Sequence, residues 1–341
     1  MGATAAMTEQ QLLEAARDGD EQAFAALVDS HRSALFAHCY RMLGSPDDAE
    51  DALQDAMLRA WRGLKRFRGG SSLRSWLYAV ATNASLRAIE RRAPRMLPID
   101  YGPPSDPHGA LGEPLTESLW VDPLPDASLG PDATYEQRES VELAFIAALQ
   151  LLPARQRAVL ILRDVLGFSG AEVAAALQTT PASVYSALQR AHRTIDERVP
   201  ARSQQATLLS LDDAELRAIV DGYVAAWERG DVDALARLLS EEATFSMPPL
   251  ATWFRGRAAI LEFLLRRPLD GRLRWPSVAV RANGQLAFGH YRVDPHSGGV
   301  SPHSITVVTL QGAQIDAITA FLKPQLFERF ALAAPPATVT G

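Results

Sequence analysis

The sequence contains a single cysteine, no long apolar run and no excess of positive charge. One cysteine cannot form an intramolecular disulfide, and Cys39 lies in an apolar helical stretch, which indicates a buried side chain rather than a reactive thiol. No segment approaches the length needed to span a bilayer, so we expect a soluble, cytoplasmic protein without a membrane partner. The net charge of −6 argues against coating of DNA through bulk positive charge. Any DNA binding must therefore be local.

Two kinds of pattern are also missing. No short-period repeat is visible, which argues against a solenoid. No spacing of side chains imitates a metal site or a nucleophile and its base, so we expect no catalytic residue, metal or cofactor. The length of 341 residues exceeds one ordinary hydrophobic core and fits two or three compact units, of which we expect three.

Apolar residues recur at three- and four-residue spacing through residues 8–93, which predicts an almost wholly helical first unit. Within it, Ser45 and Pro46 suit the N-cap and the first turn of a helix. Residues 94–135 are rich in proline and carboxylates and cannot sustain helix, so they are predicted to form an acidic linker. Leu119 and Trp120 are unusual for a spacer, and part of this linker is therefore expected to dock elsewhere.

Helical periodicity resumes over residues 136–199, followed by a short polar joint at 201–206. The third unit, residues 207–332, alternates helical and strand patterns, with Asn283-Gly284 and Ser297-Gly298-Gly299 as hairpin signals. Helices are predicted over 214–229, 232–239 and 258–266, and strands over 244–247, 278–280, 285–293 and 304–309. The fold class is therefore multidomain, with two all-α units and one α+β unit.

Charge is separated along the first unit: carboxylates crowd one short helix, and arginines follow it. Compensation of helix dipoles explains part of this pattern. However, Trp61, Phe67, Trp76 and Tyr78 lie among the arginines, and this mixture is used to stack bases and bind the phosphates of a single strand. The helix after Phe67 is predicted to present Trp76 and the polar side chains of Asn83, Arg87 and Arg91 on one face.

The second unit contains a helix-turn-helix pattern, in which Ser169 and Thr180 suit N-caps and Pro181 the first helical position. In its last helix Val184 and Ala191 belong to the inward stripe. The outward residues are Ser183, Ser186, Gln189, Arg190 and Arg193, with Tyr185 beside them. This is a recognition helix sized for the major groove, although the same shape also occurs as a plain packing motif.

Two runs of the sequence resemble region 2 of extracytoplasmic-function (ECF) sigma factors of bacterial RNA polymerase. They are Arg41 to Trp61 and Phe67 to Tyr78. The resemblance implies that the acidic helix binds the β′ clamp helices of the polymerase core through Asp48, Asp51, Gln54, Asp55 and Leu58. It also implies that the following loop and helix bind the separated non-template strand of the promoter −10 element. The residues implied in that contact are Arg68, Ser71, Trp76, Asn83, Arg87 and Arg91.

Residues 152–193 resemble region 4 of the same family, which binds the promoter −35 element and the polymerase β flap. The residues implied in DNA binding are Thr180, Ser183, Tyr185, Ser186, Gln189, Arg190 and Arg193. This helix has fewer basic residues than is usual in the family, so base preference cannot be transferred. The resemblance also implies that the acidic linker threads through the polymerase, where its charge would mimic nucleic acid.

The block from about residue 211 to 332 resembles the SnoaL-like branch of the nuclear-transport-factor-2 superfamily, a helix-wrapped curved sheet around a pocket. Candidate pocket residues are Trp227, Phe245, Met247, Trp253, Phe288 and His290, with His303 and Asp294 as further candidates. The aromatic residues suit a plain core equally well, and the histidines suit ordinary sheet positions. Some relatives are isomerases or cyclases, but we expect no enzyme here.

A sigma factor with this third domain resembles the sigma-G/sigma-J-like subgroup, in which the domain is thought to modulate polymerase binding. The leading interpretation is a promoter-specificity subunit whose partners are core polymerase, promoter DNA and, for the third domain, a small-molecule ligand that the sequence does not identify. One rival is a stand-alone DNA-binding regulator fused to a ligand-binding or isomerase-like domain, and another is an inert interaction module. The sequence leaves open whether the third domain activates or inhibits.

Overall fold

The computed structural model describes residues 7–67, 72–116, 119–130 and 134–332. The chain divides into two compact units, which are described separately. The first unit comprises the chain up to Arg92, a short piece at 128–130 and residues 152–197. The second comprises residues 93–127, 131–151 and 198 onward. None of the helices in the described ranges combines the length and apolar character needed to cross a membrane.

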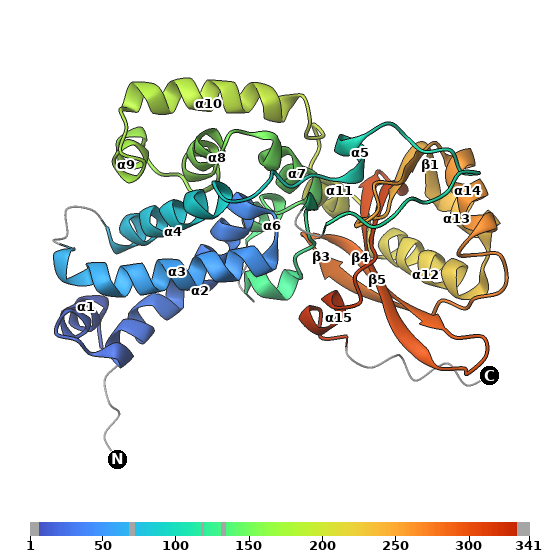
Figure 1. Ribbon diagram of the computed structural model, residues 1–341, viewed down its shortest axis with the longest axis horizontal. Helices are drawn as coiled ribbons and strands as arrows, with labels where there is room; N and C mark the ends of the chain where they lie inside the picture. Colours follow the sequence, from blue (N-terminus) through green and yellow to red (C-terminus); the bar gives the residue numbers. More distant parts are fainter. Residues whose placement is uncertain (1–6, 68–71, 117–118, 131–133, 333–341) are drawn as a thin grey trace, which may run out of the picture. The chain divides into compact units, whose positions relative to one another are not determined.

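The N-terminal part of the first unit is a bundle of four helices, as the periodicity predicted (Figure 1). They are α1 (Glu9–Arg17), α2 (Glu21–Leu43), α3 (Pro46–Gly63) and α4 (Leu73–Ile89), with a 3₁₀ turn at Leu64–Arg66. Gly44 ends α2 at a positive φ of 69°, and α3 then begins at Pro46 with Ser45 before it. Cys39 is fully buried, which confirms its predicted place in the core.

The C-terminal part of the first unit is the predicted helix-turn-helix. It consists of α8 (Ala154–Leu160), which continues as a π-helical turn over Ile161–Val165, then α9 (Gly170–Ala176) and α10 (Pro181–Asp196). Ser169 caps α9 and Thr180 caps α10 through side-chain hydrogen bonds, as their positions predicted. Val184 and Ala191 are fully buried, so the inward stripe of α10 is confirmed.

The second unit is built on one six-stranded mixed sheet in the order β2-β1-β6-β5-β4-β3, in which only β1 and β6 are parallel. The strands are β1 (Leu239–Ser246), β2 (Trp253–Arg255), β3 (Ser277–Ala282), β4 (Gln285–Val293), β5 (Val300–Gln311) and β6 (Gln314–Phe321). Three helices of this unit pack with the sheet: α12 (Asp213–Arg229), α13 (Val232–Leu238) and α14 (Arg257–Arg266) (Figure 1). Their apolar side chains share one core with the sheet.

The rest of the second unit is made of short elements: α5 (Pro98–Tyr101), α6 (Tyr135–Glu139), α7 (Leu143–Leu151), α11 (Gln204–Leu209) and α15 (Leu326–Arg329). Two of these correct the sequence-based predictions. The linker contains the helical turn α5, which starts at Pro98, where proline is tolerated. The expected polar joint at 201–206 leads into α11, which Ser203 caps. The sequence pattern did not predict β2, which has three residues, or β6, which lies between two other strands.

Candidate functional surfaces

The acidic helix α3 presents one exposed face. Asp51, Gln54 and Leu58 are exposed, and half of the Leu58 side-chain surface is open to solvent. Asp55 lies on the same face and forms an ion pair with Arg59 at 2.7 Å. These positions are three or four residues apart, so their side chains line one side of the helix. The face therefore combines one exposed leucine with carboxylate and amide groups.

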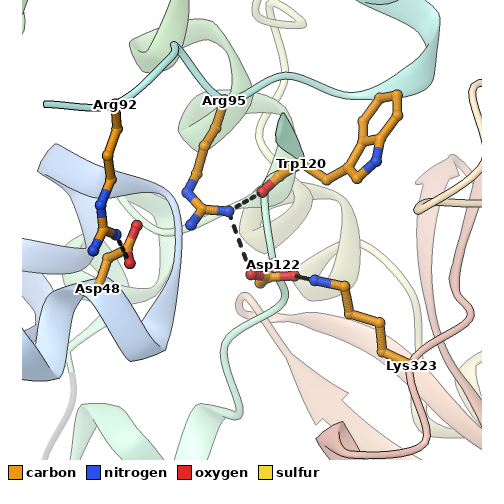
Figure 2. Close-up of polar contacts among 6 residues, drawn as sticks. All are labelled: Asp48, Arg92, Arg95, Trp120, Asp122 and Lys323. Atoms are coloured by element: carbon orange, nitrogen blue, oxygen red, sulfur yellow. Dashed lines mark hydrogen bonds and ion pairs between the residues drawn. The ribbon is translucent and has the colours of Figure 1, made fainter. Parts of the chain in front are cut away.

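Asp48 differs from the other residues predicted to bind polymerase. Its side chain is buried, and it forms an ion pair with Arg92, which follows the end of α4 (Figure 2). In the sequence Asp48 lies in a run of carboxylates with no basic residue among them. Its ion pair could not be predicted, because the partner is 44 positions away. In this structure Asp48 therefore holds α3 to the end of α4 and does not belong to the exposed face.

The predicted single-strand surface of α4 is only partly open. Arg91 is exposed and Arg87 is half-buried, whereas Arg68 and Ser71 lie outside the described residues. Trp76 packs its ring 5.0 Å from that of Phe67. Phe67 and Tyr78 are buried, so neither of these two rings of the aromatic and arginine mixture is open for base stacking in this conformation. Aromatic side chains among arginines were read as a surface mixture, but they form part of the core.

Part of the α4 face contacts the helix-turn-helix of the same unit. The Asn83 amide donates to the Ala176 carbonyl oxygen at 3.3 Å, and the Ser75 hydroxyl donates to Glu172 at 2.8 Å. Arg74 donates to the carbonyl oxygen of Leu166 at 3.1 Å. The sequence predicted none of these three contacts, and Asn83 was predicted to contact DNA instead. In this conformation its amide is engaged within the protein.

Arg157 provides a second link between the two helical regions. Its guanidinium is buried and donates to the carbonyl oxygens of Met42, in α2, and Leu152. Burial lowers the pKa of Arg157 to about 10, so the side chain remains charged at neutral pH. A charged donor buried between two helical regions supports one specific packing arrangement, because its hydrogen bonds are costly to leave unmade.

The outward face of α10 is exposed within its unit. The seven residues predicted to bind DNA there are all exposed in the structure: Thr180, Ser183, Tyr185, Ser186, Gln189, Arg190 and Arg193. The Thr180 hydroxyl also accepts from the Ser183 backbone amide as the helix cap. Tyr185 leans on α9, since its hydroxyl lies beside Gly170. The helix therefore presents amide, hydroxyl and guanidinium groups together, as recognition of base edges and phosphates requires.

The linker is docked on the sheet of the second unit. The Ser105 amide donates to the Trp253 carbonyl oxygen at 2.7 Å, and the Trp253 indole donates to the Gly102 carbonyl oxygen at 2.8 Å. The Leu115 amide donates to Pro249 at 3.0 Å. These bonds run beside β2, the edge strand of the sheet, whose backbone groups would otherwise be exposed. Trp120 is fully buried, which confirms that part of the linker docks.

A buried cluster of charges fastens the same linker. The Lys323 amine lies 2.6 Å from the Asp122 carboxylate, and the Arg95 guanidinium lies 3.6 Å from it (Figure 2). Arg95 also donates to the Trp120 carbonyl oxygen at 2.5 Å. The three charged side chains are each about 8% exposed. Asp122 therefore neutralises buried cations of its own protein.

The tip of the β3–β4 hairpin is a second anchor. Asn283 adopts a positive φ of 56° and Gly284 one of 68°, as the hairpin signal requires. The buried Asn283 side chain accepts from the Leu124 amide at 2.9 Å and donates to the Val141 carbonyl oxygen at 2.7 Å. The sequence predicted the turn but not these contacts, which join the linker and the segment before α7 to the sheet.

Glu142 and Gln285 complete this anchor. The Glu142 carboxylate accepts from the backbone amides of Gln204 and Gln205 at 2.9 Å each, at the start of α11. Gln285 accepts from the Leu143 amide at 2.8 Å. Burial raises the pKa of Glu142, an effect that these backbone hydrogen bonds oppose. These bonds hold the start of α7 to α11 and to β4 within the second unit.

The second unit contains a pocket of about 290 Å³. Its walls are mainly apolar and include Trp227, Phe245, Met247, Trp275, His290 and Leu322. Four of the six predicted pocket residues thus line it, and His303 does so as well. Trp253 and Phe288 do not, because Trp253 packs under the linker and Phe288 stacks on Tyr223 with ring centroids 4.2 Å apart. Asp294 is exposed and caps its own turn.

The pocket histidines are poor acid–base groups at neutral pH. Burial lowers the pKa of His290 to about 3 and that of His303 to about 4. Both side chains are therefore neutral, and no carboxylate is among the residues that line the pocket. Within the described ranges, no three histidine, cysteine or acidic side chains come together as metal ligands. The geometry is that of a binding cavity.

Comparisons with known proteins find three matched regions along the chain. Residues 27–95 match the family model "Sigma-70 region 2", residues 142–195 match "Sigma-70, region 4", and residues 220–321 match "SnoaL-like domain". The chain is 41% identical to the ECF RNA polymerase sigma factor SigG of Mycobacterium tuberculosis over 326 residues, which are 93% of this chain and 85% of SigG. It is 30% identical to the Escherichia coli sigma-E factor over 193 residues, 57% of this chain and 95% of that protein.

The fold also has a solved counterpart. The crystal structure of the sigma factor SigJ of Mycobacterium tuberculosis matches with a TM-score of 0.60 and 22% identity, covering 90% of this chain and 99% of SigJ. That likeness concerns the fold, whereas the identity to SigG extends over most of both sequences. The chain belongs to the ECF family of RNA polymerase sigma factors, non-enzymatic proteins that direct transcription initiation, and it carries a SnoaL-like domain at its C-terminal side.

Proposed function

We propose that this sigma factor acts in the cytoplasm and binds core polymerase at the β′ clamp helices through the exposed face of α3. The observation that carries the proposal is the clustering of Asp51, Gln54, Asp55 and Leu58 on one face with a half-exposed leucine. Asp48 acts indirectly, because its ion pair with Arg92 holds the end of α4 to α3. The region-4 helices would bind the β flap and, through α10, the −35 element.

This proposal predicts that Leu58→Asp or Asp51→Arg in the full-length protein weakens binding to bacterial core polymerase at least tenfold. The first change places a charge in an apolar contact and the second reverses one charge of the face, and neither residue is buried. Affinity is measured by fluorescence anisotropy with labelled sigma factor, alongside promoter-directed transcription. The control is Asp29→Arg, which makes the same charge change at an exposed position of α2.

Wild-type affinity in both α3 variants would exclude this face as the polymerase anchor. Loss of affinity in the Asp29→Arg control as well would show that net charge, and not the α3 face, governs the interaction.

A second proposal concerns the −10 element, for which the predicted basic residues among the described ones are the half-buried Arg87 of α4 and the exposed Arg91, two residues past the end of that helix. Arg87→Ala and Arg91→Ala are each expected to reduce open-complex formation. If each arginine contacts a phosphate, the slope of log affinity against log salt falls by about 1 per residue. The check is a salt titration of holoenzyme on a pre-melted promoter fragment. An unchanged slope would remove that residue from the phosphate contacts.

We also propose that the described arrangement of the first unit is a closed form. Asn83 and Ser75 bind groups of α9 while Arg157 bridges the helical regions. A DNA strand lying along α4 would need the Asn83 amide and the surface beside it. Binding to polymerase and promoter would therefore separate the helix-turn-helix from α4.

The SnoaL-like domain is proposed to modulate activity by holding the linker. Asp122 and Leu124 of the linker are bound to Lys323 and Asn283 of the domain. The start of α7 is held in the same unit through Glu142 and Gln285. A linker that threads through polymerase must first leave these contacts. The domain is thus proposed to restrain initiation until its hold on the linker is released.

A further inference from the structure

Two residues that line the pocket of the SnoaL-like domain carry a buried polar atom with no hydrogen-bond partner among the described protein atoms, Nε2 of His290 and Nε1 of Trp227. His290 is 2% exposed and lines the cavity. Its Nδ1 lies 2.7 Å from the Ser277 hydroxyl, and its Nε2 has no hydrogen-bond partner among the described protein atoms. A buried polar atom without a partner costs free energy, so an atom in this position is expected to serve a bound group.

The hydrogen bonds of Ser277 determine the tautomer of His290. The Ser277 hydroxyl donates its single proton to the Trp275 carbonyl oxygen at 2.9 Å, and a carbonyl oxygen can only accept. The 2.7 Å contact with His290 must then be made by an Nδ1 proton donated to the serine oxygen. Because the ring is neutral, Nε2 carries a lone pair and no proton. The free atom of His290 is an acceptor.

The remaining lining limits the chemistry of a ligand further. Trp227, Phe245 and Met247 provide apolar walls, and no acidic side chain lines the cavity to bind a cation. Ser304 and Thr306 also line it, but hydroxyl groups can donate or accept and so do not discriminate. Arg267 and Arg292 line the pocket as exposed residues, so they lie toward solvent. The buried lining is therefore mainly apolar, with His290 Nε2 as an obligatory acceptor and the Trp227 indole N–H as an obligatory donor.

One wall of the cavity comes from the linker. Leu111 lines the pocket and packs against the domain core, while its carbonyl oxygen accepts from the Thr252 hydroxyl. On either side of Leu111 in the sequence, the Ser105 and Leu115 amides donate to the carbonyl oxygens of Trp253 and Pro249. A molecule in the cavity would touch Leu111 and add apolar contact between linker and domain. Occupancy of the pocket and docking of the linker therefore share a surface.

We propose that the pocket binds a small, mainly apolar ligand that donates a hydrogen bond from an uncharged hydroxyl or N–H group to His290 Nε2, and that the bound ligand tightens docking of the linker through Leu111. The inference rests on the proposed role of this domain in holding the linker, but ligand binding is tested on the full-length protein without polymerase. Failure of the polymerase experiments would leave the pocket result intact, and the reverse also holds.

The test uses three matched probes, 2-naphthol, naphthalene and 2-methoxynaphthalene, of which only 2-naphthol donates a hydrogen bond. Binding to the full-length protein is followed through tryptophan fluorescence, because Trp227 and Trp275 line the cavity. We expect 2-naphthol to bind at least tenfold more tightly than the other two. Equal affinity for all three would overturn the role of His290, and absence of binding would overturn the pocket as a ligand site.

Variants of His290 separate recognition from folding. His290→Leu removes the acceptor and should reduce the preference for 2-naphthol over naphthalene to about onefold while naphthalene still binds. His290→Gln supplies an amide oxygen acceptor and should restore part of the preference. A purely structural histidine would instead weaken all three probes together, and circular dichroism spectra identify a variant that has not folded. Preservation of the preference in His290→Leu would overturn the proposal.

Hydrogen exchange tests the coupling to the linker. Saturating 2-naphthol should slow amide exchange at residues 105–116 about threefold or more in the wild-type protein. Leu111→Ala should abolish this protection, whereas Leu115→Ala, at a linker residue that does not line the pocket, should retain it. Unchanged or faster exchange on saturation of the wild-type protein would overturn the coupling.

Discussion

Replacing Arg157 by methionine is expected to raise the population of separated helical regions in the first unit about tenfold or more. The arginine donates to Met42 of α2 from a buried position in the helix-turn-helix. A hydrogen bond from a charged group contributes about 1.5–3 kcal/mol, and about 1.4 kcal/mol corresponds to a factor of ten in an equilibrium. Methionine keeps most of the apolar volume and removes the donors. The closed form should therefore lose its specific link and keep its core.

The measurement is pulsed electron paramagnetic resonance between spin labels on Asp29→Cys and Ser183→Cys, exposed positions of α2 and α10. The native Cys39 does not interfere, because it is fully buried and burial raises the pKa of its thiol to about 12. Arg155→Met is the matched control, since it makes the same change at an exposed position of α8. Identical distance distributions for the wild-type and Arg157→Met proteins would contradict the prediction.

Elements governed by local pattern were predictable from the sequence. The outward face of α10 follows from the period of its apolar residues together with the cap at Thr180, and both are present. The hairpin at Asn283-Gly284 follows from two residues suited to positive φ. The family resemblance rests on contiguous runs of the same kind, which is why the sequence alone indicated the family and the fold class.

What the sequence could not show are the partners of polar residues. The family resemblance implied that Asp48 belongs to the polymerase-binding surface, but its ion-pair partner Arg92 is far along the chain. Asn83 was assigned to DNA by its helix face, and its amide binds Ala176, 93 positions away. Membership of the pocket likewise depends on how strands pair, so Phe288, buried beside Tyr223, could not be separated from His290 by periodicity alone.

The second large effect concerns the buried charges that fasten the linker. Asp122→Asn is expected to lower the free energy of local opening at residues 119–126 by about 3 kcal/mol, a typical loss when a buried ion pair is broken. The change leaves Arg95 and Lys323 as two buried cations that have lost their shared carboxylate. Hydrogen exchange of peptides covering this stretch measures the opening, because the amides of Val121 and Leu124 are hydrogen-bonded in the docked linker.

The number of buried charges that each variant leaves without a counter-charge predicts the order of their effects on linker docking. Lys323→Met removes one cation and leaves Asp122 with Arg95, so its cost should be less than half that of Asp122→Asn. The double variant, Asp122→Asn with Lys323→Met, removes one of the two buried cations that have lost Asp122. It should therefore recover part of the free energy of opening that Asp122→Asn loses. Since release of the linker is proposed to relieve restraint, promoter-directed transcription should rise most in Asp122→Asn and least in Lys323→Met. Faster exchange in Lys323→Met than in Asp122→Asn would contradict this order and would mean that the Lys323–Asp122 ion pair, and not the two cations left without Asp122, governs linker docking.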